Sequence, residues 1–166
     1  MNSSHQQFIS NLRESLIKDN QIVGDIEFTT GNYGEDGNLI KKSIPTITTD
    51  FCEVGVYNDI IYLTFIIYSI SCNKKLFDFI KNYSHIKIYG FKDFHTILYP
   101  CSDFNYQGFV EKIKHDKYLQ IQFNYKYSEL VEDKLYIEYL KLRNVFINSK
   151  VNVVNQLAVN LKEEKY

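Results

Sequence analysis

The sequence YNDIIYLTFIIYSIS, residues 57–71, is the most apolar stretch of this 166-residue chain, and it decides the fold class. Its apolar run, from Ile60 to Ile70, is shorter than the about 20 residues that a helix needs to cross a bilayer. The run is rich in β-branched and aromatic residues, which favour pleated surfaces. We therefore predict a long central β-strand rather than a membrane span.

The residues just before this run predict a tight hairpin. Asn58 and Asp59 suit a two-residue turn, and folding the chain there pairs Tyr57 with Ile60. The same register pairs Val56 with Ile61, Val54 with Leu63 and Cys52 with Phe65. One face of the hairpin is then apolar and comprises Val54, Val56, Ile61, Leu63 and Phe65. The other face is mixed and comprises Glu53, Tyr62, Thr64 and Tyr68, so we expect only partial cover over it.

Length and composition predict one globular domain, residues 1–166. Hydrophobic residues make up 45% of the chain and aromatic residues 16%, which is enough for a core. The formal net charge of −1 gives no overall field to attract nucleic acid or an anionic membrane, so no membrane is expected as a partner, and nucleic acid would need a local basic patch. The abundance of Ile, Asn, Lys, Tyr and Phe, with Ala158 as the only alanine, indicates an AT-rich genome and reduces the weight of the tyrosines as functional signals.

Cysteine usage and the N-terminus predict a cytoplasmic protein. The cysteines, Cys52, Cys72 and Cys101, form no CxxC motif, so neither a disulfide framework nor a zinc site is expected. The first residues, MNSSHQQFIS, lack the basic and apolar regions of a secretion signal.

Two elements are predicted before the hairpin. Apolar residues at helical spacing, Phe8, Leu12 and Leu16, predict a helix over about residues 4–19. Residues 22–30, IVGDIEFTT, alternate apolar and polar side chains, which predicts a half-buried strand. The inward side chains of this strand are expected to be Ile22, Ile26 and Phe28.

Several elements are predicted after the hairpin. Residues 72–84, CNKKLFDFIKNYS, predict a short helix capped by Asn73, with an apolar stripe on one face. Residues 85–91 and 94–100 predict two strands. Residues 107–127 predict a further hairpin, which turns at His115 and Asp116.

These elements predict an α+β fold, predominantly antiparallel and split-barrel-like. The β-rich core spans about residues 22–127. That many antiparallel strands in one small domain tend to curl into a barrel, because closure removes their edges. A C-terminal segment, residues 129–161, has a periodicity that fits both a helix and a strand, and residues 162–166 are expected to fray.

The order of these elements resembles the pyridoxamine 5′-phosphate oxidase-like FMN-binding split barrels over about residues 5–110. The stretches that carry the resemblance are GEDGNLIKKSIPTI (34–47), YNDIIYLTF (57–65), SCNKKLFDFIKN (71–82) and HIKIYGF (85–91). Two positions depart from the family pattern. Ile44 stands where the family has an arginine, and Tyr83 stands where it has the proline of an Asn-Pro pair.

The resemblance implies a flavin site at the short helix. Lys75, assisted by Ser71 or Lys74, would meet the phosphate of FMN, because a helix N-terminus and an ammonium group both favour a phosphate. The implied activity is that of an oxidoreductase, in which the flavin supplies the chemistry and the protein positions it. The resemblance also implies a homodimer with the cofactor at its interface.

Other candidate residues have two interpretations each. Asp93 and His95 share a strand face, as two ligands of a metal ion would. Cys101 follows His95 and precedes Asp103, as a cysteine nucleophile with its partners could. The sequence shows no third metal ligand and no activated thiolate, which favours a turn aspartate, an ordinary histidine and a small buried cysteine.

The acidic residues also have two interpretations. Asp25 and Glu27 lie on one strand face, with Glu53 nearby, and fit either an acid–base pair or a solvated face. Residues 132–134, Glu-Asp-Lys, are similar to the end of a nuclease motif, but no upstream aspartate-bearing strand accompanies them.

Three functions are therefore compatible with the sequence. The first is an FMN-binding oxidoreductase. The second is a non-catalytic interaction or inhibitor protein of an AT-rich bacterium or mobile element, with an unknown protein partner. The third is a single-stranded nucleic-acid binder that stacks bases on the aromatic residues of 86–91 and 117–127. A phosphate site at residues 71–75 would favour the first over the second.

Overall fold

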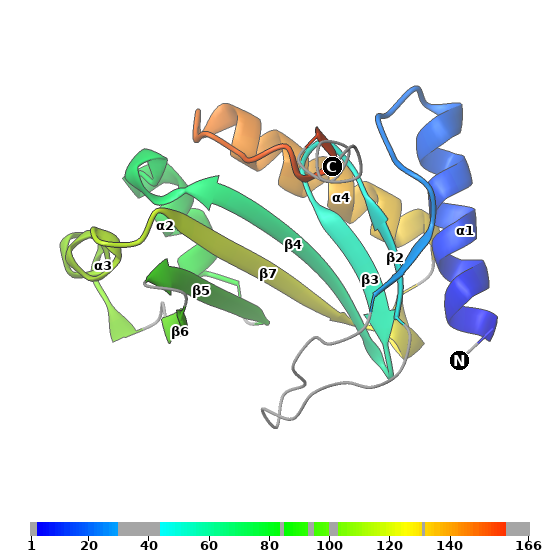
Figure 1. Ribbon diagram of the computed structural model, residues 1–166, viewed down its shortest axis with the longest axis horizontal. Helices are drawn as coiled ribbons and strands as arrows, with labels where there is room; N and C mark the ends of the chain where they lie inside the picture. The colour runs from blue at the N-terminus through cyan, green and yellow to red at the C-terminus, as the bar shows by residue number, and fades with distance from the viewer. Residues whose placement is uncertain are drawn as a thin grey trace.

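The computed structural model describes residues 3–29, 44–83, 85–92, 95–99, 103–130 and 132–158. In this part of the chain, seven strands form one antiparallel sheet in the order β1-β2-β3-β4-β7-β5-β6 (Figure 1). The strands are β1 (Glu27–Thr29), β2 (Ile44–Thr48), β3 (Glu53–Tyr57), β4 (Ile60–Tyr68), β5 (Ile86–Lys92), β6 (His95–Tyr99) and β7 (Tyr118–Lys126). The helices are α1 (Ser3–Lys18), α2 (Lys74–Lys81), α3 (Tyr106–Ile113) and α4 (Glu132–Asn148), with 3₁₀ turns η1 (Ser69–Ser71) and η3 (Tyr127–Glu129).

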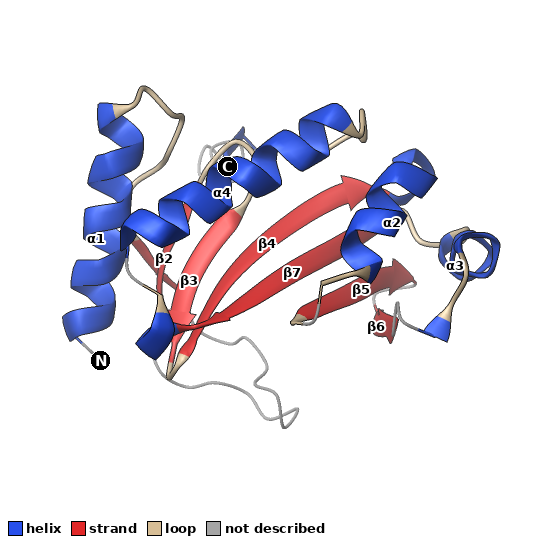
Figure 2. Ribbon diagram, turned by 180° about the vertical axis from the view of Figure 1, so that it is seen from behind, coloured by secondary structure: helices blue, strands red, loops and turns tan. Residues whose placement is uncertain are grey.

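The helices cover one face of the curved sheet. Seen from behind, α4 crosses this face diagonally and α2 lies beside it (Figure 2). α1 packs against α4 and against β2 and β3, and α3 packs against α2. The predicted α+β class with an antiparallel sheet is confirmed. The predicted closure into a barrel is wrong for the described strands, because β1 and β6 end the sheet order and do not pair with each other.

The predicted hairpin at the centre of the sheet is confirmed. β3 and β4 pair in the expected register, with Tyr57 opposite Ile60 and Val54 opposite Leu63. Asn58 has a positive φ of 53°, which a tight turn requires. This ladder ends where Glu53 lies opposite Thr64. The predicted pairing of Cys52 with Phe65 is therefore not part of it.

β4 continues beyond its partner β3, and the C-terminal residues complete its free edge. Val153 forms an isolated antiparallel bridge with Ile67. The Tyr68 N–H donates to the Asn152 carbonyl oxygen (3.0 Å), and the Val154 N–H donates to the Ile66 carbonyl oxygen (2.7 Å). The C-terminal segment is therefore helical over α4 and extended just after it.

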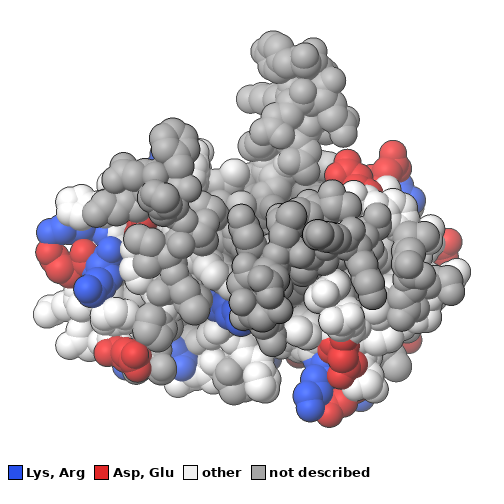
Figure 3. Space-filling view, turned by 60° about the horizontal axis from the view of Figure 1, so that its bottom comes forward, with Lys and Arg blue, Asp and Glu red and all other residues white. Residues whose placement is uncertain are grey.

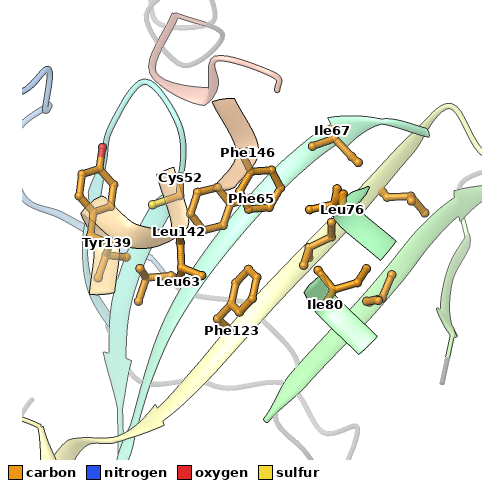
Figure 4. Close-up of a cluster of buried hydrophobic side chains, with 14 of the residues drawn as sticks. Cys52, Leu63, Phe65, Ile67, Leu76, Ile80, Phe123, Tyr139, Leu142 and Phe146 are labelled. Carbon is orange, nitrogen blue, oxygen red and sulfur yellow. The ribbon is translucent and has the colours of Figure 1, made fainter. Parts of the chain in front are cut away.

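The core lies between the helices and the apolar face of the hairpin. The predicted core residues of this face, Val54, Val56, Ile61, Leu63 and Phe65, are each at most 1% exposed. The Phe65 ring stacks on Phe146 of α4 with centroids 4.4 Å apart and meets the edge of Phe123 of β7 at 5.7 Å (Figure 4). This aromatic contact holds α4 on the two longest strands of the sheet.

The predicted hairpin over residues 107–127 is wrong in its first half, which is helix α3. Asn105 caps this helix, since its side chain accepts a hydrogen bond from the Gly108 N–H (2.7 Å). Phe109 and Ile113, four residues apart, are both buried, so the segment has a helical rather than an alternating apolar pattern. The second half is β7, as predicted.

The predicted strand over residues 22–30 is shorter than expected and faces differently. Only Glu27–Thr29 pair as β1. Ile22 is 58% exposed and Phe28 is 43% exposed, although both were expected to face inward. The Gly24 N–H donates to the Thr48 carbonyl oxygen (2.9 Å), and Val23 forms a bridge with Thr49. These contacts direct Val23 rather than Ile22 to the core.

The two phenylalanines Phe65 and Phe28 provide a matched test of this facing. We expect Phe65→Ala to lower the free energy of unfolding by about 3–5 kcal/mol, because it empties a fully buried position between α4 and β7. Phe28→Ala should lower it by less than about 1 kcal/mol, because that ring is already half exposed. Urea denaturation of both variants measures the difference, and equal losses would contradict the assigned facing.

Candidate functional site

The three residues predicted to bind a flavin phosphate lie at the corner between β4 and α2. Ser71 ends η1, and Lys74 and Lys75 begin α2. Asn73 caps this helix, as predicted, because its side chain accepts a hydrogen bond from the Leu76 N–H (3.0 Å). The corner therefore has the helix N-terminus that the sequence indicated.

The end of α4 meets this helix N-terminus. Lys75 Nζ donates to the Asn148 carbonyl oxygen (3.1 Å), and Asn73 Nδ2 donates to the Ser149 carbonyl oxygen (2.6 Å). Figure 2 shows α4 ending beside the beginning of α2. The carbonyl groups that end a helix have no partner within it and carry partial negative charge, so the positive N-terminal end of α2 complements them.

The other two predicted phosphate ligands also have partners within the protein. Lys74 Nζ forms an ion pair with Asp78 Oδ2 (2.6 Å) on the helix surface. Ser71 Oγ donates to the Tyr68 carbonyl oxygen (2.6 Å) and accepts from the Asn152 N–H (3.0 Å). A phosphate at this corner would have to displace these contacts. The FMN site stays a prediction.

The turn η1 is held in place from both sides. The Ser69 N–H donates to the Lys117 carbonyl oxygen (3.1 Å), and the Ser69 hydroxyl donates to the Asp116 carbonyl oxygen. The Cys72 N–H closes the turn by donating to the Ser69 carbonyl oxygen (3.1 Å). Asp116 is itself buried, and its carboxylate accepts a hydrogen bond from the Tyr99 hydroxyl (2.6 Å). The turn is therefore a rigid part of the fold.

Ile70 projects from the middle of this turn and is 94% exposed. Beside it, Tyr68 is 38% exposed and its ring packs against Tyr118, with centroids 5.2 Å apart. Lys117 Nζ lies 5.3 Å from the centre of the Tyr118 ring. We call these four residues, Tyr68, Ile70, Lys117 and Tyr118, the Ile70 surface. They combine an apolar side chain, two aromatic rings and a cation on a fixed backbone.

The acidic residues proposed as an acid–base pair are divided between different partners. Asp25 is almost fully exposed and forms an ion pair with Arg13 (2.9 Å). The pKa of Glu53 is raised from its ordinary value, mainly by burial and further by the charge of Glu27. Glu27 and Glu53 therefore influence each other electrostatically, while Asp25 serves the contact between α1 and the segment that follows it.

The remaining predicted sites gain no support. Asp93 and Cys101 lie outside the described residues, and Asp103 is exposed. Residues 132–134 form the first turn of α4 rather than the end of a strand. Among the residues that the structure describes, no group of three or more His, Cys, Asp or Glu side chains could hold a metal ion.

Two features of the structure were not predicted from the sequence. The apolar pattern of the sequence places Ile70 at the end of the run of the central strand, whereas Ile70 lies in the turn η1, for which the serines on both sides of it are a signal. Glu138 on α4 accepts hydrogen bonds from the hydroxyls of Tyr83 (3.3 Å) and Tyr125 (3.1 Å). No local motif connects these three residues, because they come from three separate elements.

None of the helices in the described residues is both long and apolar enough to cross a membrane.

Comparisons with known proteins support the fold and leave the function open. No family model matches the chain, and no curated protein matches its sequence. A solved structure of a conserved hypothetical protein from Pyrococcus furiosus is similar, with a TM-score of 0.65 and 18% sequence identity. The similarity covers 85% of this chain and 89% of that chain. At this identity the likeness shows the fold alone.

The junction between α2 and α4 can be tested with two capping asparagines. Asn73 and Asn105 each cap a helix, but only Asn73 also donates across to α4. We expect Asn105→Ala to cost about 1 kcal/mol of unfolding free energy, and Asn73→Ala to cost about 1 kcal/mol more. Thermal or urea denaturation measures both, and equal costs would contradict a stabilising role for the junction.

Proposed function

We propose that this chain is a non-catalytic protein-binding protein, and that the Ile70 surface is where its partner docks. The observation that carries this proposal is the exposure of Ile70, at 94%, on a turn fixed by hydrogen bonds to residues 116, 117 and 152. Single exposed apolar residues are common on protein surfaces, but among the described residues Ile70 is the most exposed large apolar one, ahead of Ile137 at 63%, and it stands on a rigid backbone.

Rigid presentation favours tight binding. Burying an isoleucine side chain in a partner's pocket contributes about 1.5–3 kcal/mol. A mobile loop would lose part of this gain in ordering its backbone, but η1 is already ordered by its contacts with β7 and the C-terminal segment. Tyr68 and Tyr118 add aromatic area beside it, and aromatic residues are enriched in the centres of interfaces.

Charge indicates the chemistry of the partner. Lys117 belongs to the Ile70 surface, and Lys150 is exposed two residues before Asn152, which contacts Ser71. Complementary potentials favour association. The partner is therefore a protein with an apolar pocket bordered by carboxylates.

The other two functions have less support. Ser71, Lys74 and Lys75 are engaged within the protein, so a flavin phosphate would compete with existing contacts. Nucleic-acid binding needs a basic surface, whereas the net charge is −1. On the face seen in Figure 3, acidic and basic side chains of the described residues lie interspersed rather than gathered by sign.

Photo-crosslinking identifies the partner. Substitutions of two exposed isoleucines, Ile70 and Ile137, then test whether the partner binds at the Ile70 surface. A crosslinking residue at position 70 should capture a defined protein in cells, and the same residue at position 137 should not. With that protein purified, Ile70→Asp should weaken binding at least tenfold, or about 1.4 kcal/mol. Ile137→Asp, on the exposed side of α4, should change binding less than twofold.

Both variants should unfold at nearly the same denaturant concentration as the parent, because both side chains are exposed. Capture of a second copy of this chain through position 70 would identify the partner as itself. Equal capture at both positions, or equal weakening by both variants, would overturn the proposal.

A further inference from the structure

A carboxylate lies between α2 and α4, at some distance along both helices from their junction. Glu138 Oε2 accepts hydrogen bonds from the hydroxyls of both Tyr83, which follows α2, and Tyr125, at the end of β7. The two helices meet where Asn73 contacts Ser149 and run apart from there (Figure 2). The Glu138 site therefore lies toward the opposite ends of both helices, where Tyr83 just after α2 contacts α4.

Among the described residues, the hydrogen bonds to the Glu138 carboxylate come from neutral donors, and the nearby Lys141 forms no ion pair with it. The Glu138 side chain is half-buried, and no lysine, arginine or histidine of the described residues forms an ion pair with it. Both tyrosine hydroxyls bond to Oε2, and Oε1 accepts no hydrogen bond from the described residues. A partly buried carboxylate without a counter-charge is unfavourable, so a cation beside Oε1 would be stabilised.

Aromatic rings pack together around Tyr83, whose hydroxyl donates to this carboxylate. Tyr83 packs against Phe79 and against the edge of Phe123, with both centroid distances 5.1 Å. Lys141 Nζ, on the exposed side of α4, lies 5.8 Å from the centre of the Tyr83 ring. An ammonium group therefore already reaches this ring, and a ring face attracts a cation at this distance. Carboxylate and ring together have the chemistry that recognises a cation on an alkyl chain.

We propose that Glu138 and the Tyr83 ring form a binding site for an alkylammonium group, such as a lysine side chain or a free alkylamine. Tyr125 holds Glu138 in place by its hydroxyl. Lys141 occupies the ring when no ligand is present and swings into solvent when one binds. This site is separate from the Ile70 surface and does not depend on it.

A titration with n-butylammonium, followed by NMR shifts of the residue 125 and 138 amides, tests the site. The parent protein should show saturable shifts, and n-butanol, which has the same length without the charge, should not. Glu138→Gln keeps acceptors for the tyrosine hydroxyls and removes the charge, so it should weaken binding at least tenfold. Glu129→Gln, an exposed acid in η3, should change it less than twofold.

N-acetyl-lysine amide distinguishes the two sources of the ligand. If it binds more tightly than n-butylammonium, the ligand is a protein side chain; if it binds more weakly, the ligand is a free amine. The proposal is overturned if n-butylammonium does not saturate by about 100 mM, if n-butanol shifts the same amides equally, or if Glu138→Gln binds as the parent does. Thermal denaturation of Glu138→Gln confirms that the fold is kept in the variant tested.

Discussion

The unequal pairing of β4 on its two edges is the constraint on which the rest of the structure depends. On one edge β4 pairs with β7 along its whole length, from Ile60 to Tyr68, whereas on the other edge β3 pairs only as far as Thr64. Beyond Thr64 the backbone groups of Ile66 and Tyr68 on that edge have no partner in β3, and an unpaired sheet edge is unfavourable. Residues 152–154 supply the missing partners. The chain must therefore return to β4 after α4.

This return places α4 and fixes the corner that follows β4. Because residues 152–154 are tied to the end of β4, α4 has to end close to the start of α2, where Asn73 and Lys75 bond to its last carbonyl groups. The polar groups that resembled a phosphate site therefore serve the packing of two helices. The same contacts fix η1 and leave Ile70 exposed on it. The proposed binding surface and the stability of the fold thus depend on one set of hydrogen bonds.

The features that sequence could predict are those set by neighbouring residues. The hairpin register follows from a two-residue turn and a period of two, and the Asn73 cap follows from its place before an apolar helical stripe. Contacts between distant residues leave no such local pattern in the sequence. Lys75 lies at the start of a helix, as expected, but the carbonyl oxygen that it bonds belongs to Asn148, 73 residues away. The prediction of a strand over residues 107–114 was wrong for a local reason. Two of the apolar residues of this short segment, Phe109 and Ile113, are four apart, which is helical rather than alternating spacing. The contacts of Glu138 with two tyrosines could not be predicted from the sequence, because one of these tyrosines is 55 residues away.

Native-state hydrogen exchange tests the central claim most directly, namely that residues 152–154 are an integral part of the sheet. The informative amides are those of Tyr68 and Val154, which bond across this edge. The reference for fast exchange is Ala158, an exposed residue whose N–H donates to the exposed Asn155 side chain. The account predicts that Tyr68 and Val154 exchange about as slowly as the amides of the central β4–β7 ladder, because opening them requires global unfolding. Exchange of both at the rate of Ala158, while the ladder stays protected, would contradict it.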